Sequence, residues 1–257
     1  MPRIALVSPL GGSGRTATTA HLLSAMAERG ASVLGIDLCA QNQLGGYLGL
    51  QQPAALGWAT SVAAGQWWGE HGLENSAQVA FLPFGQPAPD ALHHLAQTWV
   101  GKPAWLEWQL RQLELDPSTL VMLDTPVWPA PLAQQAALFA DVLLVLLDAS
   151  WRACQAQPLV RGLLAGVRSS PRVGVVVCGF DARRPSQREA LQTLRKQWGP
   201  LLLPYTVHAD ESLAQAHARG LCVMQHAAQA QSASDLQGVA SWLALQCLPA
   251  PALRATP

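Results

Sequence analysis

The stretch that decides the fold lies near the beginning of the chain and reads Ile4-Ala5-Leu6-Val7-Ser8-Pro9-Leu10-Gly11-Gly12-Ser13-Gly14-Arg15-Thr16. An apolar run passes into a glycine-rich turn, and a helical pattern follows over residues 16–29. This order predicts a strand, a phosphate-binding loop and a helix, because glycine lets backbone N–H groups converge on one point. The helix N-terminus adds its positive dipole end there. A glycine-rich turn without a ligand is the less favoured interpretation, given the position between strand and helix.

The loop also predicts which groups hold a nucleotide and its metal ion. Thr16 stands where a P-loop places the hydroxyl that binds Mg²⁺. The expected ligands are therefore a nucleotide and Mg²⁺, and the family resemblance given below implies ATP as that nucleotide. The predicted nucleotide-binding residues are those of the loop and the first helical turn: Gly11, Gly12, Ser13, Gly14, Arg15, Thr16 and Ala17.

Composition limits the class of protein. The chain has 257 residues, half of them hydrophobic, which suits one large α/β domain. We expect that domain to span residues 1–248 and the proline-rich residues 249–257 to form a disordered tail. With 12% charged residues and a net charge of zero, nucleic acid is an unfavoured partner, because phosphate neutralisation needs excess Lys and Arg. The sequence shows neither a signal peptide nor a bilayer-spanning run, so a cytoplasmic location is expected.

Further apolar runs predict the sheet. Residues 32–36, 120–124, 141–148 and 172–180 read as buried strands, and residues 79–85 and 201–205 as further strands. Strand–helix–strand units of this length imply parallel pairing with right-handed crossovers. The expected fold is a single-domain α/β P-loop NTPase fold, a mostly parallel twisted sheet with helices on both faces.

Two acidic residues end two of these predicted strands. Asp37 follows residues 32–36, and Asp124 ends residues 120–124 in the manner of a Walker B strand, whose acid binds Mg²⁺ through water. Ligands of open parallel sheets bind at the carboxyl ends of the strands. The predicted metal-binding residues are therefore Thr16, Asp37 and Asp124, and Asp37 is also the single candidate catalytic residue.

Aromatic residues gather in two segments that we expect to be helical, residues 56–68 and 89–115. Trp105 and Trp108 are three residues apart and share a helix face, which favours a core position. The alternative is a surface for a partner, since exposed tryptophans favour interfaces.

Other polar groups point to no additional site. Arg183, Arg184 and Arg188 favour a solvated loop and helix start over a binding patch. The five cysteines lack zinc-site spacing and are expected to be small buried hydrophobic residues. The histidines are scattered, and a nine-residue step disfavours a metal site on one helix.

The loop resembles that of the MinD/ParA-type ATPases, K-G-G-x-G-K-[ST]. Arg15 takes the position of the lysine that grips the phosphate in that family. Leu10 takes that of a second lysine, which in the family reaches across a dimer to the partner's nucleotide. Arginine keeps the charge as a bulky planar fork, whereas leucine keeps none.

The same family usually reads D-x-D-P-Q after the second strand, where the second acid orients the attacking water. Asp37 matches the first acid and Cys39 replaces the second. A neutral thiol positions water poorly, so slow or absent hydrolysis is expected. Cys178 replaces an asparagine that reads adenine in the family, which leaves the base preference open.

Several segments are similar to one branch of that family, the BcsQ-type cellulose-biosynthesis proteins. They are Leu56-Gly57-Trp58-Ala59, Ala64-Gly65-Gln66-Trp67, Phe81-Leu82-Pro83-Phe84-Gly85-Gln86, Leu203-Pro204 and His208-Ala209-Asp210-Glu211. The resemblance implies a nucleotide-binding partner of a membrane-embedded cellulose synthesis and secretion complex. It also implies a homodimer, with a small accessory protein as a further partner class.

Three functions follow from these observations. The first is an ATP-binding switch or scaffold in a cellulose secretion complex, at most a weak Mg-dependent ATPase, peripheral to the inner membrane through its partners. The second is a nucleotide-free pseudo-ATPase adaptor, favoured by the changed residues Leu10, Arg15, Cys39 and Cys178. The third is a ParA-like ATPase that positions DNA or large cargo, which the zero net charge disfavours.

Overall fold

The computed structural model describes residues 1–167 and 170–248. Their strands form one eight-stranded sheet in the order β3-β4-β2-β5-β1-β6-β7-β8. The strands are β1 (Arg3–Val7), β2 (Val33–Asp37), β3 (Leu73–Glu74), β4 (Ala80–Leu82), β5 (Leu120–Asp124), β6 (Val142–Asp148), β7 (Arg172–Phe180) and β8 (Leu202–His208). The predicted disordered tail, residues 249–257, lies outside the described residues.

The pairing of the strands is parallel except at one edge. β1 lies between β5 and β6 and pairs with both in parallel. β2 pairs in parallel with β4 and β5, and β7 with β6 and β8. The short edge strand β3 runs antiparallel to β4. The predicted mostly parallel sheet is confirmed, and β3 is an addition that its two-residue length left undetected.

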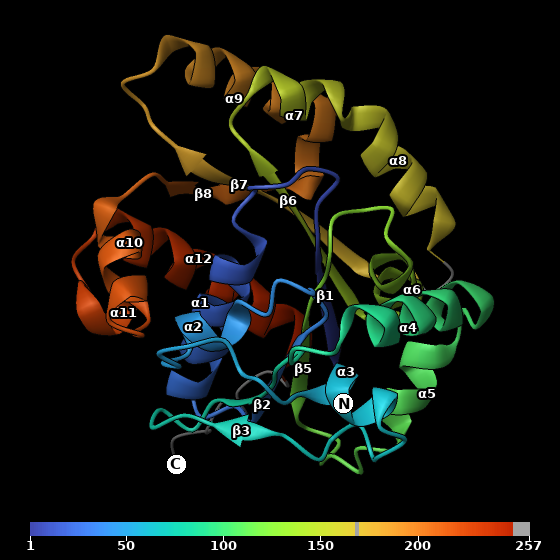
Figure 1. The fold of residues 1–257 in the computed structure, drawn as a ribbon. Coiled ribbons are helices and arrows are strands. Elements are labelled where there is room, and N and C mark those ends of the chain that lie inside the picture. Colours follow the sequence, from blue (N-terminus) through green and yellow to red (C-terminus); the bar gives the residue numbers. More distant parts are fainter. Residues whose placement is uncertain (168–169, 249–257) are drawn as a thin grey trace, which may run out of the picture.

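Helices cover both faces of the sheet (Figure 1). One face carries α1 (Arg15–Glu28), α2 (Leu44–Tyr47), α10 (Glu211–Ala218), α11 (Val223–His226) and α12 (Gln231–Cys247). The other carries α3 (Trp58–Ala63), α4 (Pro89–Gly101), α5 (Trp105–Arg111), α6 (Pro131–Phe139), α7 (Trp151–Gln155), α8 (Gln157–Gly166) and α9 (Pro185–Trp198). A short 3₁₀ helix, Gly199–Leu201, leads into β8.

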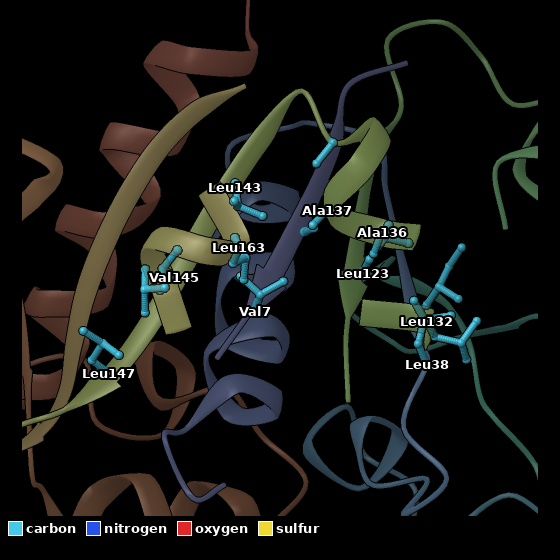
Figure 2. Packing of buried hydrophobic residues seen from close by; sticks show 14 of the residues in the cluster. Val7, Leu38, Leu123, Leu132, Ala136, Ala137, Leu143, Val145, Leu147 and Leu163 are labelled. Atoms are coloured by element: carbon cyan, nitrogen blue, oxygen red, sulfur yellow. The ribbon is translucent and has the colours of Figure 1, made fainter. Parts of the chain in front are cut away.

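Each central strand is buried on both sides. In β1, Ala5 and Val7 belong to the core under α6 and α8, whereas Ile4 and Leu6 belong to the core under α1 and α12. Figure 2 shows Val7, Val145 and Leu163 in the first of these cores. Because both faces are covered, the strand sequences are continuous apolar runs rather than alternating ones. That burial is why sequence alone located them.

The tryptophan-rich segments fold differently from the expectation. The helix predicted over residues 56–68 spans only Trp58–Ala63, because Gly65 takes a left-handed conformation (φ 69°) and the chain turns. The helix predicted over residues 89–115 divides into α4 and α5 around Pro103. The shared-face prediction also fails in part, since Trp105 is 7% exposed and Trp108 is 60% exposed.

Two other segments also depart from the prediction. The sequence of residues 151–167 predicts one continuous helix, whereas the region contains two, α7 and α8. α6 was not predicted, and its Pro131 occupies the first turn, where a missing N–H has no cost. Within the described ranges, no helix is both long and apolar enough to cross a membrane.

Candidate functional site

The glycine-rich turn joins β1 to α1 in a shape that requires glycine. Gly12 (φ 75°) and Gly14 (φ 81°) are left-handed, a region that side chains rarely adopt. Gly14 is the N-cap of α1, and its carbonyl accepts the Thr18 N–H at 2.8 Å. Ser13 between them is buried, and its hydroxyl has no partner. The loop therefore exposes the backbone of its glycines, above one buried and unpaired hydroxyl, at the start of a helix, an arrangement suited to an anion.

A cavity of about 320 Å³ opens beside this loop. Leu10 and Arg15 do not line it, so neither replacement side chain fills the crevice. Its lining comes from the loop, α1 and the carboxyl ends of β6, β7 and β8 with the helices that follow: Gly12, Ser13, Gly14, Ala17, Thr18, His21, Asp148, Ala149, Ser150, Cys178, Gly179, Gln187, Val207, Leu213 and Leu236. The sequence did not predict that the lining includes Thr18 and His21 of α1, or Val207 of β8, Leu213 of α10 and Leu236 of α12. Only the fold brings these segments together.

Thr16 and Asp124 meet at the carboxyl ends of β1 and β5. The Thr16 hydroxyl donates to Asp124 Oδ2 at 2.7 Å. The other oxygen of this fully buried carboxyl group, Oδ1, has no partner. A buried acceptor without a donor is costly unless a cation or an ordered water meets it. Together with the Thr16 hydroxyl it offers the hard oxygen ligands that Mg²⁺ prefers, so the residues present fit that ion.

Asp37 has a different environment. It is the register partner of Asp124 on the neighbouring strand. Its Oδ1 accepts the Cys39 N–H at 2.9 Å and its Oδ2 accepts the Leu44 N–H at 3.0 Å. Both oxygens thus already order the loop after β2, and the predicted metal-binding and catalytic roles of Asp37 remain predictions.

Burial is the largest influence on the pKa values of Asp37 and Asp124. It raises the pKa of the Asp37 carboxyl, and repulsion by Asp124 raises that pKa further. Burial also raises the pKa of Asp124, against the lowering effects of the Thr16 hydrogen bond and Arg15. Two carboxyl groups out of water on adjacent strands cannot both ionise at low cost without a cation. The arrangement is therefore one that a divalent ion would complete.

Cys39 lies against the same acid. Its thiol donates toward the Asp124 carbonyl at 3.6 Å and toward Oδ2 at 3.8 Å. Burial raises the pKa of this thiol well above its usual value, and the charges of Asp124 and Asp37 add to the effect. The group is accordingly a neutral weak donor. It cannot accept a proton from water as a carboxylate would.

Arg15 and Leu10 occupy the two positions that carry lysines in the MinD/ParA-type ATPases, and their side chains lie in different surroundings. Arg15 turns back, and its Nη1 donates to the Ser8 carbonyl at 3.4 Å, while its Nε is buried without a partner. Leu10 is partly buried and packs against the core on the α6 face. The charge at position 15 thus stays under the loop, and position 10 contributes apolar contact alone.

The remaining candidates lie apart from the cavity or serve the fold. Arg183 and Arg184 both pair with Asp181, in agreement with a solvated loop before α9. His208 pairs with Asp235 at 2.8 Å, and His217 stacks on Tyr47. Four cysteines are buried, as expected, whereas Cys247 is only partly buried, and all five are free. Among the described residues, the one cluster with metal-ligating geometry is Asp37, Cys39 and Asp124.

A glycine loop after the first strand, with a Walker B acid on the adjacent parallel strand, defines a P-loop nucleotide-binding fold of the MinD/ParA type. Solved structures agree. The chain is similar to apo McdA of Cyanothece, with a TM-score of 0.77 and 18% identity over 95% of this chain and 99% of that one. It is also similar to MinD of Pyrococcus horikoshii complexed with Mg-ADP, with a TM-score of 0.75 and 18% identity over 95% and 96% of the two chains.

Sequence comparison narrows the class. The family described as "Cellulose biosynthesis protein BcsQ" matches residues 1–248. A curated relative of that name from Salmonella typhi is 27% identical over 245 residues, covering 91% of each chain. This chain belongs to the BcsQ family of cellulose biosynthesis proteins.

Proposed function

We propose that this chain is an ATP-binding switch or scaffold that associates with a bacterial cellulose synthesis and secretion complex and hydrolyses ATP slowly or not at all. The observation that carries the proposal is the pairing of an open cavity at the glycine loop with the Thr16–Asp124 contact, whose free carboxyl oxygen is buried. Backbone N–H groups of residues 11–17 would hold the phosphates. Thr16 and Asp124 would hold Mg²⁺ or its water ligands, with Asp37 beside them.

The family and the structural neighbours support nucleotide binding. McdA of Cyanothece has a solved ATP complex, and MinD of Pyrococcus horikoshii a Mg-ADP complex. Mg²⁺, when bound, neutralises phosphate charge and lowers the cost of holding a triphosphate beside buried acids. The chain's own contribution is to orient the phosphates along the loop and to keep Asp124 fixed through Thr16.

Slow hydrolysis follows from the groups beside the metal position. Cys39 presents a buried neutral thiol where a water-orienting acid would stand in related ATPases. Leu10 presents no charge to a phosphate. A bound nucleotide would therefore persist, which suits a switch or scaffold whose state depends on occupancy rather than on turnover.

The partners proposed for the chain follow from its family. They are a second copy of the chain in a homodimer, subunits of the cellulose synthase and secretion complex at the inner membrane, and a small accessory protein. The location proposed is the cytoplasm, with attachment to the membrane through these partners. A complex between MinC and MinD of Aquifex aeolicus is a structural neighbour, which supports a partner-binding role for this fold.

A second candidate function is a nucleotide-free adaptor. It is favoured by four changed side chains: Leu10, Arg15, Cys39 and Cys178. A ParA-like role in DNA or cargo positioning has one supporting observation, the 27% identity with the chromosome-partitioning ATPase Soj of Thermus thermophilus. The zero net charge speaks against non-specific DNA binding.

Single-turnover retention of ATP separates these functions. Purified chain would be mixed with radiolabelled Mg-ATP, passed through a desalting column and sampled over an hour. The switch or scaffold retains label as ATP, with less than about one turnover per minute, well below typical enzymes. Rapid release of ADP would contradict slow hydrolysis. Absence of retained label, with no binding in equilibrium dialysis at millimolar Mg-ATP, would favour the adaptor.

A further inference from the structure

The nucleotide site carries an arginine that the loop sequence does not reveal. Arg152 lies in the first turn of α7, directly after β6. Its Nη2 donates to the carbonyl of Gly11 in the glycine loop at 3.3 Å. The same nitrogen pairs with Asp148 Oδ2 at 3.1 Å. The guanidinium group therefore bridges the loop and the end of β6, two segments that both line the cavity.

We infer that Arg152 is a phosphate-binding residue of this nucleotide site, which supplies the second positive charge that Leu10 does not. The inference rests on the proposed nucleotide binding and concerns which side chain of the same chain neutralises the phosphates.

Charge balance within the cavity supports this assignment. Asp148 lines the cavity, and an unpaired carboxylate there would repel a triphosphate. Arg152 neutralises it at the rim. The second nearby cation, Arg15, donates to the Ser8 carbonyl under the loop and lies close enough to lower the pKa of Asp124. One cation thus faces the buried acids, and the other stands at the outer edge of the loop.

The local contacts fix the position of Asp148 and leave the Arg152 side chain free to move. Ser150 caps α7 by accepting the Ala153 N–H at 3.2 Å, and its hydroxyl donates to Asp148 Oδ1 at 2.9 Å. Asp148 is thereby fixed as the anchor of the ion pair. The Arg152 side chain is 58% exposed, so it can leave the Gly11 carbonyl for an arriving phosphate. Guanidinium forks bind phosphate oxygens in bidentate geometry, which favours exchange of a neutral carbonyl for an anion.

An arginine that only fastened the loop would behave differently from one that binds phosphate. A fastening role needs a hydrogen-bond donor to Gly11, which glutamine could provide. A phosphate-binding role needs charge, which lysine could provide. The matched variants are therefore Arg152→Gln and Arg152→Lys. The control is Arg111→Gln, which removes another exposed i,i+4 ion pair, with Glu107 on α5.

The experiment is titration calorimetry of the full chain with Mg-ATP, Mg-ADP and AMP. We expect Arg152→Gln to weaken Mg-ATP binding about tenfold, the usual scale for loss of one charged phosphate contact, and AMP binding less than about twofold. Arg152→Lys restores most of the Mg-ATP affinity, and Arg111→Gln binds like the wild type. Affinity of Arg152→Gln equal to that of the wild type overturns the inference. So does equal weakening for all three nucleotides, or failure of lysine to restore binding.

The outcome for the wild type keeps the two proposals distinguishable. A wild-type chain that binds no Mg-ATP overturns nucleotide binding, and the role of Arg152 falls with it. A wild-type chain that binds Mg-ATP, with Arg152→Gln unaffected, overturns only the role of Arg152. Circular dichroism of each variant, recorded before titration, removes misfolding as an explanation.

Discussion

The carboxyl ends of the central strands, with the glycine loop where we propose that the nucleotide binds, form what we call the nucleotide edge. This edge and the tryptophan cluster beside the sheet are built in opposite ways. The edge consists of backbone turns and short polar side chains. Two of its buried atoms have no partner: Oγ of Ser13, a residue that lines the cavity, and Oδ1 of Asp124, a residue that does not. The tryptophan cluster consists of aromatic rings whose centroids lie 4.8 to 6.5 Å apart: Trp58, Trp68, Phe84, Trp99 and Trp105. Two of its indole N–H groups, those of Trp68 and Trp99, are also unpartnered, but rings pack around them.

One hydrogen bond joins the two regions. Trp58 Nε1 donates to the backbone carbonyl of Asp37 at 2.7 Å, at the point where β2 ends beside Asp124. The cluster therefore contacts the end of β2 through this bond, while none of its residues lines the cavity. From this difference we expect stability and the proposed nucleotide binding to be largely separable: ring packing would supply the first, and loop geometry with a few oxygens the second.

The largest expected effect is on stability, through Trp58. Trp58→Ala removes a fully buried indole that contacts four rings, which should lower the free energy of unfolding by about 3–5 kcal/mol. Urea denaturation followed by circular dichroism measures the loss. Trp58→Phe, which keeps ring packing but not the hydrogen bond to Asp37, should lose about half as much. A loss below about 1 kcal/mol for Trp58→Ala would contradict the supporting role.

An intermediate effect is expected at Cys39. Cys39→Asp places a third carboxyl group beside Asp37 and Asp124 in a buried site. Without Mg²⁺ this should cost about 1–3 kcal/mol of stability, because a buried carboxylate lacks compensation. Thermal unfolding with and without millimolar Mg²⁺ tests it, since the ion should restore more stability to Cys39→Asp than to the uncharged control Cys39→Ser. Identical responses of the two variants to Mg²⁺ would disagree with a metal position at this edge.

A smaller, pH-dependent effect is expected at His21, which lines the cavity. Burial lowers the pKa of its imidazole from 6.5 to about 4, and His217 adds to the lowering. The unfolded chain therefore binds more protons between these pH values, so the stability present above pH 6.5 is lost as pH falls through 4. His21→Gln should reduce this loss of the free energy of unfolding, measured by urea denaturation at several pH values from 7 to 4. The exposed control His94→Gln should leave this loss unchanged. The same loss in His21→Gln as in the wild type would refute its assignment to His21.

The smallest effect is expected on the outer face of α5. Trp108 is exposed, so Trp108→Ala should change stability by no more than about 0.5 kcal/mol. Trp105→Ala, three residues earlier and buried in the cluster, should cost several-fold more. Urea denaturation of both variants gives the ratio, and similar losses would show that the two tryptophans share one environment after all.

The sequence predicted the nucleotide edge better than the tryptophan cluster for a physical reason. The loop from Gly11 to Thr16 is encoded locally by glycines and a hydroxyl, and β5 and β6 are continuous apolar runs, so both patterns are legible over a few residues. The cluster assembles side chains from three helices and two loops, and Gly65 and Pro103 break the helical pattern. Whether Trp105 or Trp108 faces inward depends on tertiary packing that periodicity does not contain.

Within the candidate site too, contacts that depend on the fold could not be predicted from the sequence. Thr16 and Asp124 could be paired from the sequence because each ends a recognisable motif. Arg152 could not be placed, since its approach to Gly11 depends on β1 and β6 being neighbours. The two backbone hydrogen bonds that occupy the Asp37 carboxyl group were equally hidden, because they come from the course of the loop into α2.

We propose above all that the glycine loop with Thr16 and Asp124 binds a magnesium-bound nucleotide. Equilibrium dialysis of Mg-ATP against the wild type, Thr16→Ala and the surface control Thr193→Ala on α9, each with Mg²⁺ and with excess EDTA, tests it most directly. We expect Mg²⁺-dependent binding by the wild type and the control, and at least about tenfold weaker binding by Thr16→Ala, the loss expected for one ligand of the metal site. Equal binding by all three proteins, unaffected by EDTA, would contradict it.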